Sequence, residues 1–387
     1  MSVIYLDHIS SNPLHPKVKE AIIEYLEQDG FGNPSSQHRI GDGAVERLEA
    51  ARSSVARLIN AKSEEIVFTS GGTESNNQAI KGVAFAMPGK GKHIITSNIE
   101  HTSVSRSVRT LVRLGYEATS VPVDKYGLVD PADVEKAIRD DTILVSIMHA
   151  NNEIGTVEPI AEIGRITRAR NVLFHTDAIA SCGNIPVDVD ELGVDLLSLA
   201  ANQFCGPSGI GALYVRENTR MAPVMEGGIQ ENNRRAGTPN MLGIVAMGKA
   251  AELARAELYS RMQHLFALRK ALLDRIATID EVFLNGHPDK CRPGLRSVSV
   301  NYIEGESMLI MLDEEGVNVS TRSACAAGSL RASHVLIAAG RDYTDAQGTI
   351  VFSLGAGNTL GEVENAFEAF KRSVTFLREM SPLYKKK

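Results

Sequence analysis

Short apolar segments alternate with helical patterns through the first two thirds of this 387-residue chain. This alternation is typical of an α/β domain whose sheet is mostly parallel. Each of these segments is short, apolar and bounded by polar or helical stretches, as a buried strand would be. They are 65–69, 93–96, 117–121, 142–147, 172–175, 196–199 and 211–215. We therefore expect a mostly parallel sheet of seven strands.

The last third of the chain follows a different pattern. An amphipathic stretch from about residue 239 to about 279 predicts helices that leave the α/β domain. Three strand-like segments then follow with helices between and after them, which indicates a smaller α+β domain; they are 296–300, 317–320 and 348–353. The predicted boundaries are 15–255 for the large domain, with 1–14 and 256–387 forming the small one.

The composition argues against several classes of function. A formal net charge of -6, without a basic stripe, argues against binding to nucleic acid. No segment approaches the length of a membrane span, and the first residues lack a basic region followed by an apolar run. We expect a cytoplasmic protein. The four cysteines have no paired or CxxC spacing, which argues against a disulfide framework.

Polar clusters follow the predicted strands, at the sheet edge where open parallel sheets bind ligands. Segment 69–77 joins a strand to a helix, and its glycines and free amide groups suit a phosphate, although such a segment is often only a turn. His101 follows the next strand and can stack on an aromatic ring, or can simply bond at the sheet edge. Asp177 ends a later strand, where its carboxylate suits a pyridinium nitrogen. Together they favour a site for a phosphorylated ring.

The chain also resembles the cysteine desulfurases of the NifS and IscS type, which are fold-type I pyridoxal phosphate enzymes. The matching motifs extend over nearly the whole chain. They are Phe-Gly-Asn-Pro-Ser-Ser at 31–36, Thr-Glu-Ser at 73–75, Asn-Asn-Glu-Ile-Gly at 151–155, Arg-Ala-Gly-Thr at 235–238 and Ser-Ala-Cys at 323–325. The resemblance implies an aminotransferase-like fold and a homodimer.

The resemblance also assigns roles to single residues. Thr73 would bind the cofactor phosphate, and His101 would stack on the ring. Asn152 would contact the ring or its hydroxyl, and Asp177 would pair with the ring nitrogen. Thr238 would reach the phosphate that the neighbouring subunit of the homodimer binds.

The turn that holds the lysine in this family differs here. The family's Ser-Gly-His-Lys reads Ala-Ala-Asn-Gln at 200–203, and no lysine occurs between Lys136 and Lys249. In the family, this lysine holds pyridoxal phosphate as a Schiff base. Because a carboxamide cannot form an imine, Gln203 excludes that covalent step. Standard desulfurase activity is predicted to be absent or very weak, with pyridoxal phosphate bound non-covalently or not at all.

Other positions of the same site depart from the family as well. Its phosphate-binding serine and histidine align with Ala200 and Asn202, and a glutamine aligns with Ala180. The arginine that pairs with the substrate carboxylate aligns with Val351, and a second arginine position holds Ala356. Losing a charge-assisted contact of this kind forfeits about 1.5–3 kcal/mol. The site is interpreted as retired from ordinary desulfuration or converted to other chemistry.

Thiol chemistry does not require the missing lysine. Cys325 lies in a run of small residues, 320–329, which favours an exposed loop. By the resemblance it would be the nucleophile that carries persulfide sulfur, and its thiol could also ligate an iron–sulfur cluster. Cys182 and Cys205 follow Ala180 and Gln203 by two residues, so they either approach the pocket or face the core.

These observations predict a desulfurase-like protein of sulfur transfer or iron–sulfur cluster assembly that uses Cys325. One alternative is an enzyme of different chemistry in the remodelled pocket, and another is a non-catalytic pseudoenzyme that regulates or docks. The segment Met-Ser-Pro-Leu-Tyr at 380–384 resembles the tail with which IscS-type proteins dock their iron–sulfur scaffold protein. A frayed terminus is the other explanation for this segment.

Overall fold

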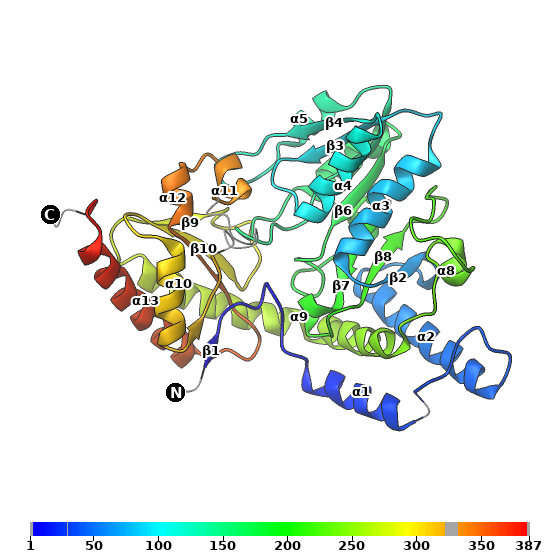
Figure 1. Ribbon diagram of the computed structural model, residues 1–387, viewed down its shortest axis with the longest axis horizontal. Helices are drawn as coiled ribbons and strands as arrows, with labels where there is room; N and C mark the ends of the chain where they lie inside the picture. Colours follow the sequence, from blue (N-terminus) through cyan, green and yellow to red (C-terminus); the bar gives the residue numbers. More distant parts are fainter. Residues whose placement is uncertain (1–2, 29, 322–331, 385–387) are drawn as a thin grey trace.

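The computed structural model describes residues 3–28, 30–321 and 332–384. Cys325 therefore lies outside the described residues. Figure 1 shows the large sheet and its helices on one side of the molecule and the C-terminal sheets and helices on the other. No helix among the described residues is long and apolar enough to cross a membrane.

The large sheet has seven strands in the order β2-β8-β7-β6-β5-β3-β4, which confirms the predicted sheet. Only β8 runs antiparallel to its neighbours; the remaining pairings are parallel. The strands are β2 Ile66–Thr69, β3 His93–Ser97, β4 Glu117–Val121, β5 Thr142–Ser146, β6 Leu173–Asp177, β7 Leu196–Ala200 and β8 Gly211–Val215. Each begins and ends within two residues of its predicted bounds.

Helices cover both faces of this sheet, which explains why its strands are continuously apolar rather than alternating. Successive residues such as Ile94 and Ile95, or Leu196 and Leu197, belong to two different apolar clusters, one on each face. The helices of this part are α1 Pro16–Glu27, α2 Arg39–Leu58, α3 Gly72–Ala86, α4 Thr102–Arg113, α5 Pro131–Ala137, α6 Ile160–Ala169, α7 Val189–Leu192 and α8 Gln230–Asn233, with 3-10 turns η1 Ser63–Glu65 and η2 Ala201–Phe204.

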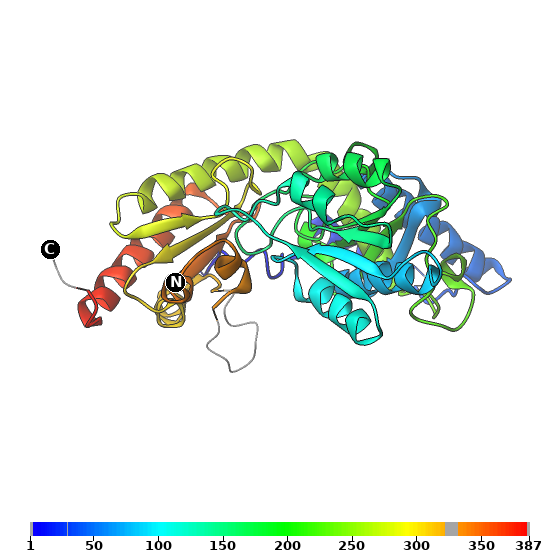
Figure 2. The ribbon, with the colours of Figure 1, turned by 90° about the horizontal axis from the view of Figure 1, so that it is seen from above.

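The stretch predicted as several helices is one helix of 36 residues, α9 Met241–Ile276. Its first half packs in the core of the large sheet through residues such as Ile244 and Met247. Its second half packs in a separate core through Leu268 and Leu272. Figures 1 and 2 show α9 extending from one part of the molecule to the other. The predicted domain boundaries near residues 15 and 255 stay a prediction.

The C-terminal part contains two small sheets. An antiparallel sheet has the order β12-β10-β9, and a two-stranded parallel sheet joins β1 to β11. The sequence did not predict β1 or β9. The elements are β1 Ile4–Tyr5, β9 Val282–Asn285, β10 Leu295–Val300, β11 Val317–Asn318, β12 Thr349–Ser353, α10 Gly305–Glu314, α11 His334–Ala338, α12 Tyr343–Gln347 and α13 Leu360–Met380.

A buried ion pair ties α2, β2 and α8 together. Both terminal nitrogens of Arg52 donate to the Glu231 carboxylate, at 2.7 and 2.9 Å. The same Arg52 side chain donates to the Ile66 carbonyl, and the Phe68 N–H donates to Glu231. Only 9% of the Arg52 side chain and 5% of the Glu231 side chain are exposed.

We predict that Glu231→Ala lowers the free energy of unfolding by about 3 kcal/mol, because it removes the buried counter-charge of Arg52 and leaves only the more exposed Glu49 paired with that guanidinium. The exposed pair between Lys62 and Glu217 offers a matched control, since its side chains are 61% and 63% exposed. Glu217→Ala should leave the urea midpoint unchanged. Equal midpoints for the two variants would contradict the role assigned to Glu231.

Candidate functional site

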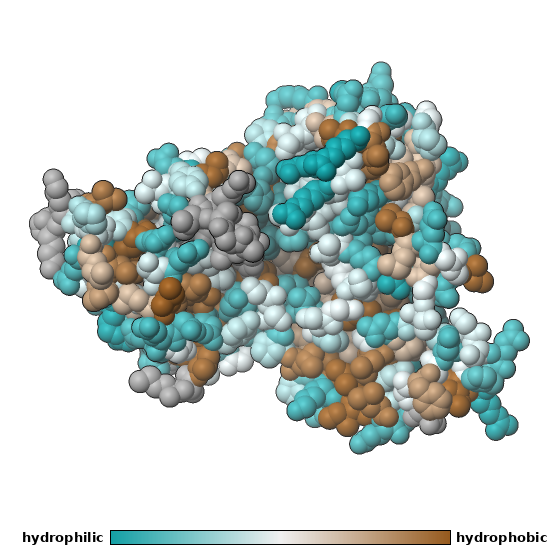
Figure 3. All heavy atoms as spheres, in the orientation of Figure 1, coloured by the Kyte–Doolittle hydropathy of each residue, from teal (hydrophilic) through white to brown (hydrophobic). Residues whose placement is uncertain are grey.

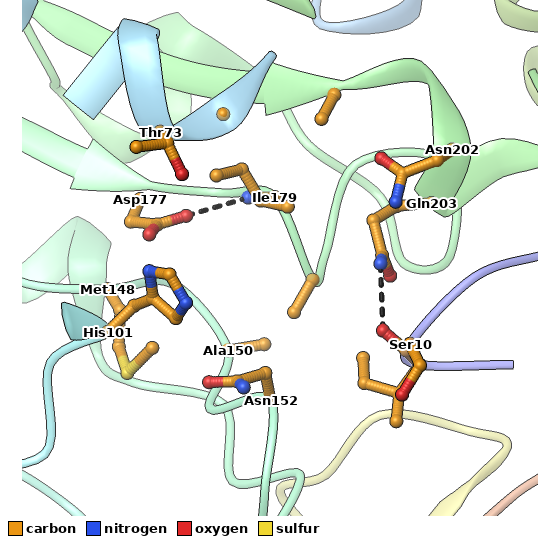
Figure 4. A pocket seen from close by; sticks show the side chains of 14 residues that line it. Ser10, Thr73, His101, Met148, Ala150, Asn152, Asp177, Ile179, Asn202 and Gln203 are labelled. Carbon is orange, nitrogen blue, oxygen red and sulfur yellow. Dashed lines mark hydrogen bonds between the residues drawn. The ribbon is translucent and has the colours of Figure 1, made fainter. Parts of the chain in front are cut away.

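A cavity of about 340 Å³ lies at the edge of the large sheet where its parallel strands end. It is lined by polar side chains on the sheet side and by the N-terminal segment that follows β1 (Figure 4). Its lining residues are Ile9, Ser10, Gly72, Thr73, His101, Met148, Ala150, Asn152, Asp177, Ile179, Ala180, Ala200, Asn202 and Gln203.

The structure brings five of the predicted site residues together in this cavity: Thr73, His101, Asn152, Asp177 and Gln203. They come from the first turn of α3, the N-cap of α4, the loop after β5, the end of β6 and the turn η2. Their individual roles stay predictions. Thr238 instead lines a separate hollow, beside Thr69 and Ser70. Cys325, the predicted nucleophile, is outside the part of the chain that the structure describes.

Among the described residues that line the cavity, Asp177 carries the one carboxylate, and neutral donors hold it in place. The Asn76 side-chain amide donates to its Oδ2 at 2.7 Å, and the Ile179 N–H donates to its Oδ1 at 3.0 Å. Burial raises the pKa of this carboxyl, while the nearby His101 acts in the opposite direction. The carboxylate is thus oriented without an arginine or lysine partner, so it is suited to accept a charged hydrogen bond from a ligand.

His101 caps the first turn of α4 with its own ring. Its Nδ1 accepts from the Ser103 N–H at 3.2 Å and lies 2.7 Å from the Ser103 hydroxyl. Because a backbone N–H donates to Nδ1, the neutral ring carries its proton on Nε2. These two contacts fix the plane of the imidazole beside Asp177, as Figure 4 shows. His101 can therefore present a ring face to a planar ligand.

Gln203 bonds to the protein itself rather than to a ligand. Its side-chain nitrogen donates to the main-chain carbonyl of Ile9 at 2.9 Å, shown as a dashed line in Figure 4. Its carbonyl oxygen Oε1 is buried and has no hydrogen-bond partner. Asn12 adds to this attachment, because its side-chain amide donates to the main-chain carbonyls of Asn202 and Gln203. The N-terminal segment is therefore tied to the turn that carries Gln203.

The cavity wall is apolar where the resemblance implies a substrate-binding arginine. Val351 on β12 is fully buried in a cluster with Ile9, Ala150, Ala180 and Leu295. Three members of this cluster, Ile9, Ala150 and Ala180, line the cavity directly. Sequence reasoning missed Ile9 and Ala150, because neither belongs to a polar motif. In the part of the chain that the structure describes, this wall therefore presents apolar side chains to a substrate carboxylate.

The end of the cavity next to α3 is also partly apolar. A Cβ built on Gly72 would lie 2.0 Å from the Ile179 side chain and 3.7 Å from the Ala200 side chain. Thr73 and the first-turn amides of α3 remain as donors there. No lysine or arginine is among the described residues that line the cavity. The residues present fit a ring that is bound without a covalent link, and they do not fit the lysine-linked cofactor.

Buried acids lie behind the cavity. Glu100 accepts from the Ser97 hydroxyl at 2.6 Å and from the Met148 N–H at 3.0 Å, and its other oxygen has no partner. Burial raises the pKa of Glu100 to about 8. Burial likewise raises the pKa of Glu158 well above its usual value and lowers the pKa of His149 to about 4. Glu100 and His149 are therefore mainly neutral near pH 7.

The three described cysteines do not line the cavity. Cys182 is fully buried in the core, and burial raises the pKa of the thiols of both Cys182 and Cys205. Cys291 is buried as well, with guanidinium nitrogens of Arg269 and Arg296 at 2.9 and 2.6 Å from its sulfur. The described residues contain no group of three or more side chains that could hold a metal ion.

The described residues on both sides of segment 322–331 are attached to the cavity wall. Ser320 exchanges both backbone hydrogen bonds with Val351, at 2.7 and 3.2 Å. On the other side, Ala332 packs against the apolar cluster that contains Met148, a lining residue. His334 bonds to the Glu100 carbonyl at 3.0 Å. The chain therefore leaves and re-enters the described structure beside the cavity.

Known proteins share this fold and align with nearly the whole chain. The model of the aminotransferase class-V family matches residues 4–366. The cysteine desulfurase IscS of Dictyoglomus turgidum is 50% identical over 380 residues, covering 98% of this chain and 96% of that protein. The IscS of Methanosarcina thermophila is 47% identical over 380 residues, covering 98% and 94%.

Solved structures agree with these relatives. A NifS-like protein superposes with a TM-score of 0.91 and 35% identity, covering 97% of this chain and 100% of the other. The apo structure of a cysteine desulfurase from Thermococcus onnurineus gives a TM-score of 0.86 and 26% identity, covering 97% and 95%.

Glu100 should make the stability of the protein depend on pH. The folded protein keeps a proton on this carboxyl up to about pH 8, whereas the glutamate of the unfolded chain releases it near its ordinary pKa of 4.5. Its contribution is therefore complete at acid pH and is lost as the pH rises toward 8, by up to about 1.4 kcal/mol per pH unit. We expect Glu100→Gln to reduce this decline in urea unfolding measured from pH 5 to 8. The same substitution at exposed Glu162 should leave the slope unchanged, and an unchanged slope in Glu100→Gln would contradict the prediction.

Proposed function

The chain belongs to the aminotransferase class-V family and is similar to cysteine desulfurases over nearly its whole length, and from this premise we propose that it transfers sulfur without lysine-dependent desulfuration. One observation carries the proposal. By the resemblance, Gln203 aligns with the reactive lysine of the family, and its side-chain nitrogen donates to the Ile9 carbonyl. The apolar wall around Val351 supports the same conclusion, because a cysteine carboxylate would meet no counter-charge there.

Cys325 is the proposed sulfur carrier, or a ligand of an iron–sulfur cluster during assembly. Since the proposal excludes a lysine-linked cofactor that would remove sulfur from cysteine, the sulfur must reach Cys325 as a persulfide carried by a donor molecule. The Cys325 thiolate attacks the terminal sulfur of that persulfide, the sulfur–sulfur bond breaks, and the donor leaves as a thiolate. No oxidant or reductant is consumed in this exchange. The attachment of Ser320 and Ala332 to the cavity wall supports a role for this segment next to the cavity.

We also propose a homodimer and a scaffold-docking tail. Apolar side chains gather on the surface over α1, including the partly exposed Ile23 and Leu26, which favours a covering partner (Figure 3). At the C-terminus, Tyr384 packs against Tyr302 and beneath Arg378, with centroid distances of 5.7 and 5.3 Å. This packing argues against a frayed tail, and it leaves Leu383 exposed for a scaffold protein.

The first prediction separates sulfur transfer from desulfuration. The purified protein given cysteine and dithiothreitol should release sulfide only at the background rate, because no lysine is among the described residues that line the cavity. When it is given polysulfide, Cys325 should gain one sulfur atom, measured by mass spectrometry of its peptide. Cys325→Ser should lose this labelling, whereas Cys205→Ser should retain it.

Robust sulfide release from cysteine would overturn the proposal. A Cys325→Ser variant that still supports cluster assembly would instead favour the non-catalytic pseudoenzyme.

The second prediction reverses the change at the lysine position. Gln203→Lys should give a yellow protein with pyridoxal phosphate, since Asp177 and His101 remain to hold the ring. Gln203→Met, of similar length but without an amine, should stay colourless. Because the wall around Val351 is unchanged, Gln203→Lys should recover cofactor binding more fully than cysteine turnover. Its affinity for cysteine should remain about tenfold or more weaker than with an arginine at position 351. A colourless Gln203→Lys variant would show that the pocket no longer accepts the phosphorylated ring.

A further inference from the structure

The thiol of Cys291 lies between two guanidinium groups, away from the cavity. Nη2 of Arg296, on β10, is 2.6 Å from its sulfur, and Nη1 of Arg269, on α9, is 2.9 Å from it. The main-chain oxygens that could accept a proton from the thiol, those of Pro288 and Asp289, are farther away, at 3.5 and 3.4 Å. Because a guanidinium can only donate, the sulfur accepts two charged hydrogen bonds, which favours a thiolate.

Among the described residues, neither guanidinium is paired with a carboxylate. Arg296 is only 1% exposed, its terminal nitrogens also contact the main-chain carbonyls of His287 and Pro288, and its buried Nε has no partner. Asp289 influences Arg269 less than the thiol does. The sulfur is therefore the anion best placed to offset two cations held in a largely buried position.

The residues outside the described part of the chain do not change this balance. Segment 322–331 contains no aspartate or glutamate. The one undescribed carboxylate side chain is that of Asp29, and its neighbour Gly30 lies against Tyr25 of α1, in the other half of the molecule (Figure 1). Cys291, Arg269 and Arg296 thus form a cluster in which the thiol supplies the negative charge.

Exposure and charge favour different thiols in this molecule. Cys205 is more exposed than Cys291, of which 6% is exposed. Burial nevertheless raises the pKa of the Cys205 thiol, and no guanidinium in the described part of the chain donates to it. Thiolates react with peroxides, whereas thiols do so poorly. Hydrogen peroxide is also far smaller than a molecule that carries a persulfide, so an enclosed thiolate can still meet it.

We propose that Cys291 is a site of oxidation by hydroperoxides, held as a thiolate by Arg269 and Arg296. The thiolate attacks one oxygen of hydrogen peroxide, a sulfur–oxygen bond forms as the oxygen–oxygen bond breaks, and the other oxygen leaves as hydroxide. The sulfur is oxidised to a sulfenic acid, and the peroxide is reduced. The guanidinium N–H groups stabilise the charge that moves to the leaving oxygen. This inference does not depend on sulfur transfer by Cys325.

Trapping of the sulfenic acid with dimedone tests the proposal. The folded protein is exposed briefly to hydrogen peroxide, the peroxide is removed with catalase, and the chain is unfolded in urea with dimedone, so that access of the trap plays no part. Mass spectrometry then measures the adduct on each cysteine peptide. Cys291 should be labelled at least tenfold faster than Cys205. The natural protein and Cys325→Ser should label Cys291 at the same rate.

Variants on α9 test the role of the guanidinium. Arg269→Gln should slow the labelling of Cys291 severalfold, whereas Arg269→Lys, which keeps a cation, should retain most of the rate. Arg255→Gln, at an exposed position of the same helix, should leave the rate unchanged. The ultraviolet absorption of the folded natural protein should also show one thiolate more than that of Cys291→Ser, a measurement that needs no arginine variant.

Faster labelling of Cys205 than of Cys291 would overturn the proposal. Equal labelling of Cys291 in the natural protein and in Arg269→Gln, or equal thiolate absorption in the natural protein and in Cys291→Ser, would overturn it as well.

Discussion

The shared direction of the strands in the large sheet is the constraint on which the cavity depends. Strands β3, β5, β6 and β7 pair in parallel, so their carboxyl ends meet at one edge. Residues far apart in sequence, such as His101 and Asp177, therefore line one cavity. Strand β8 turns back beside β7, and this reversal holds the turn that carries Gln203. The helices on both faces keep the sheet dry, so polar groups are concentrated at its edge.

The other wall comes from the N-terminal segment and the small sheets. Pairing of β1 with β11 directs the chain toward the cavity, and the Ser353 hydroxyl accepts from the Ile9 N–H at 2.9 Å. Ile9 can then accept from the Gln203 side chain. The departures at Gln203, Ala180 and Val351 are thus physically linked, since all three contribute to the same wall or to its contacts. By the resemblance, they put a carboxamide and apolar surface where the family has a lysine, a glutamine and an arginine.

Thiol groups are separated from one another in this molecule. Cys182 and Cys205 have thiols whose pKa is raised by burial, which makes them poor nucleophiles. Cys291 is enclosed and contacted by two guanidinium groups. The sulfur-carrying role that we propose for Cys325 rests on the resemblance, and the enclosed positions of the three described cysteines agree with it. The cavity and the thiol can be studied independently, because no described cysteine lines the cavity.

The sequence by itself determined the seven strands of the large sheet, because apolar periodicity is a local property. Strand-end polarity and the family resemblance together identified the five site residues that meet in the cavity. It also showed that no lysine is available at position 203. Only the tertiary structure decided what depends on distant partners. Strand β1 pairs with residues more than three hundred positions away, and α9 is continuous because two separate cores cover its two halves. The sequence spacing allowed Cys182 to face either the pocket or the core, and the structure shows that it packs in the core. The bond from Gln203 to Ile9 and the unpartnered oxygen beside it were equally invisible in the sequence, since they arise only when the N-terminal segment closes the cavity.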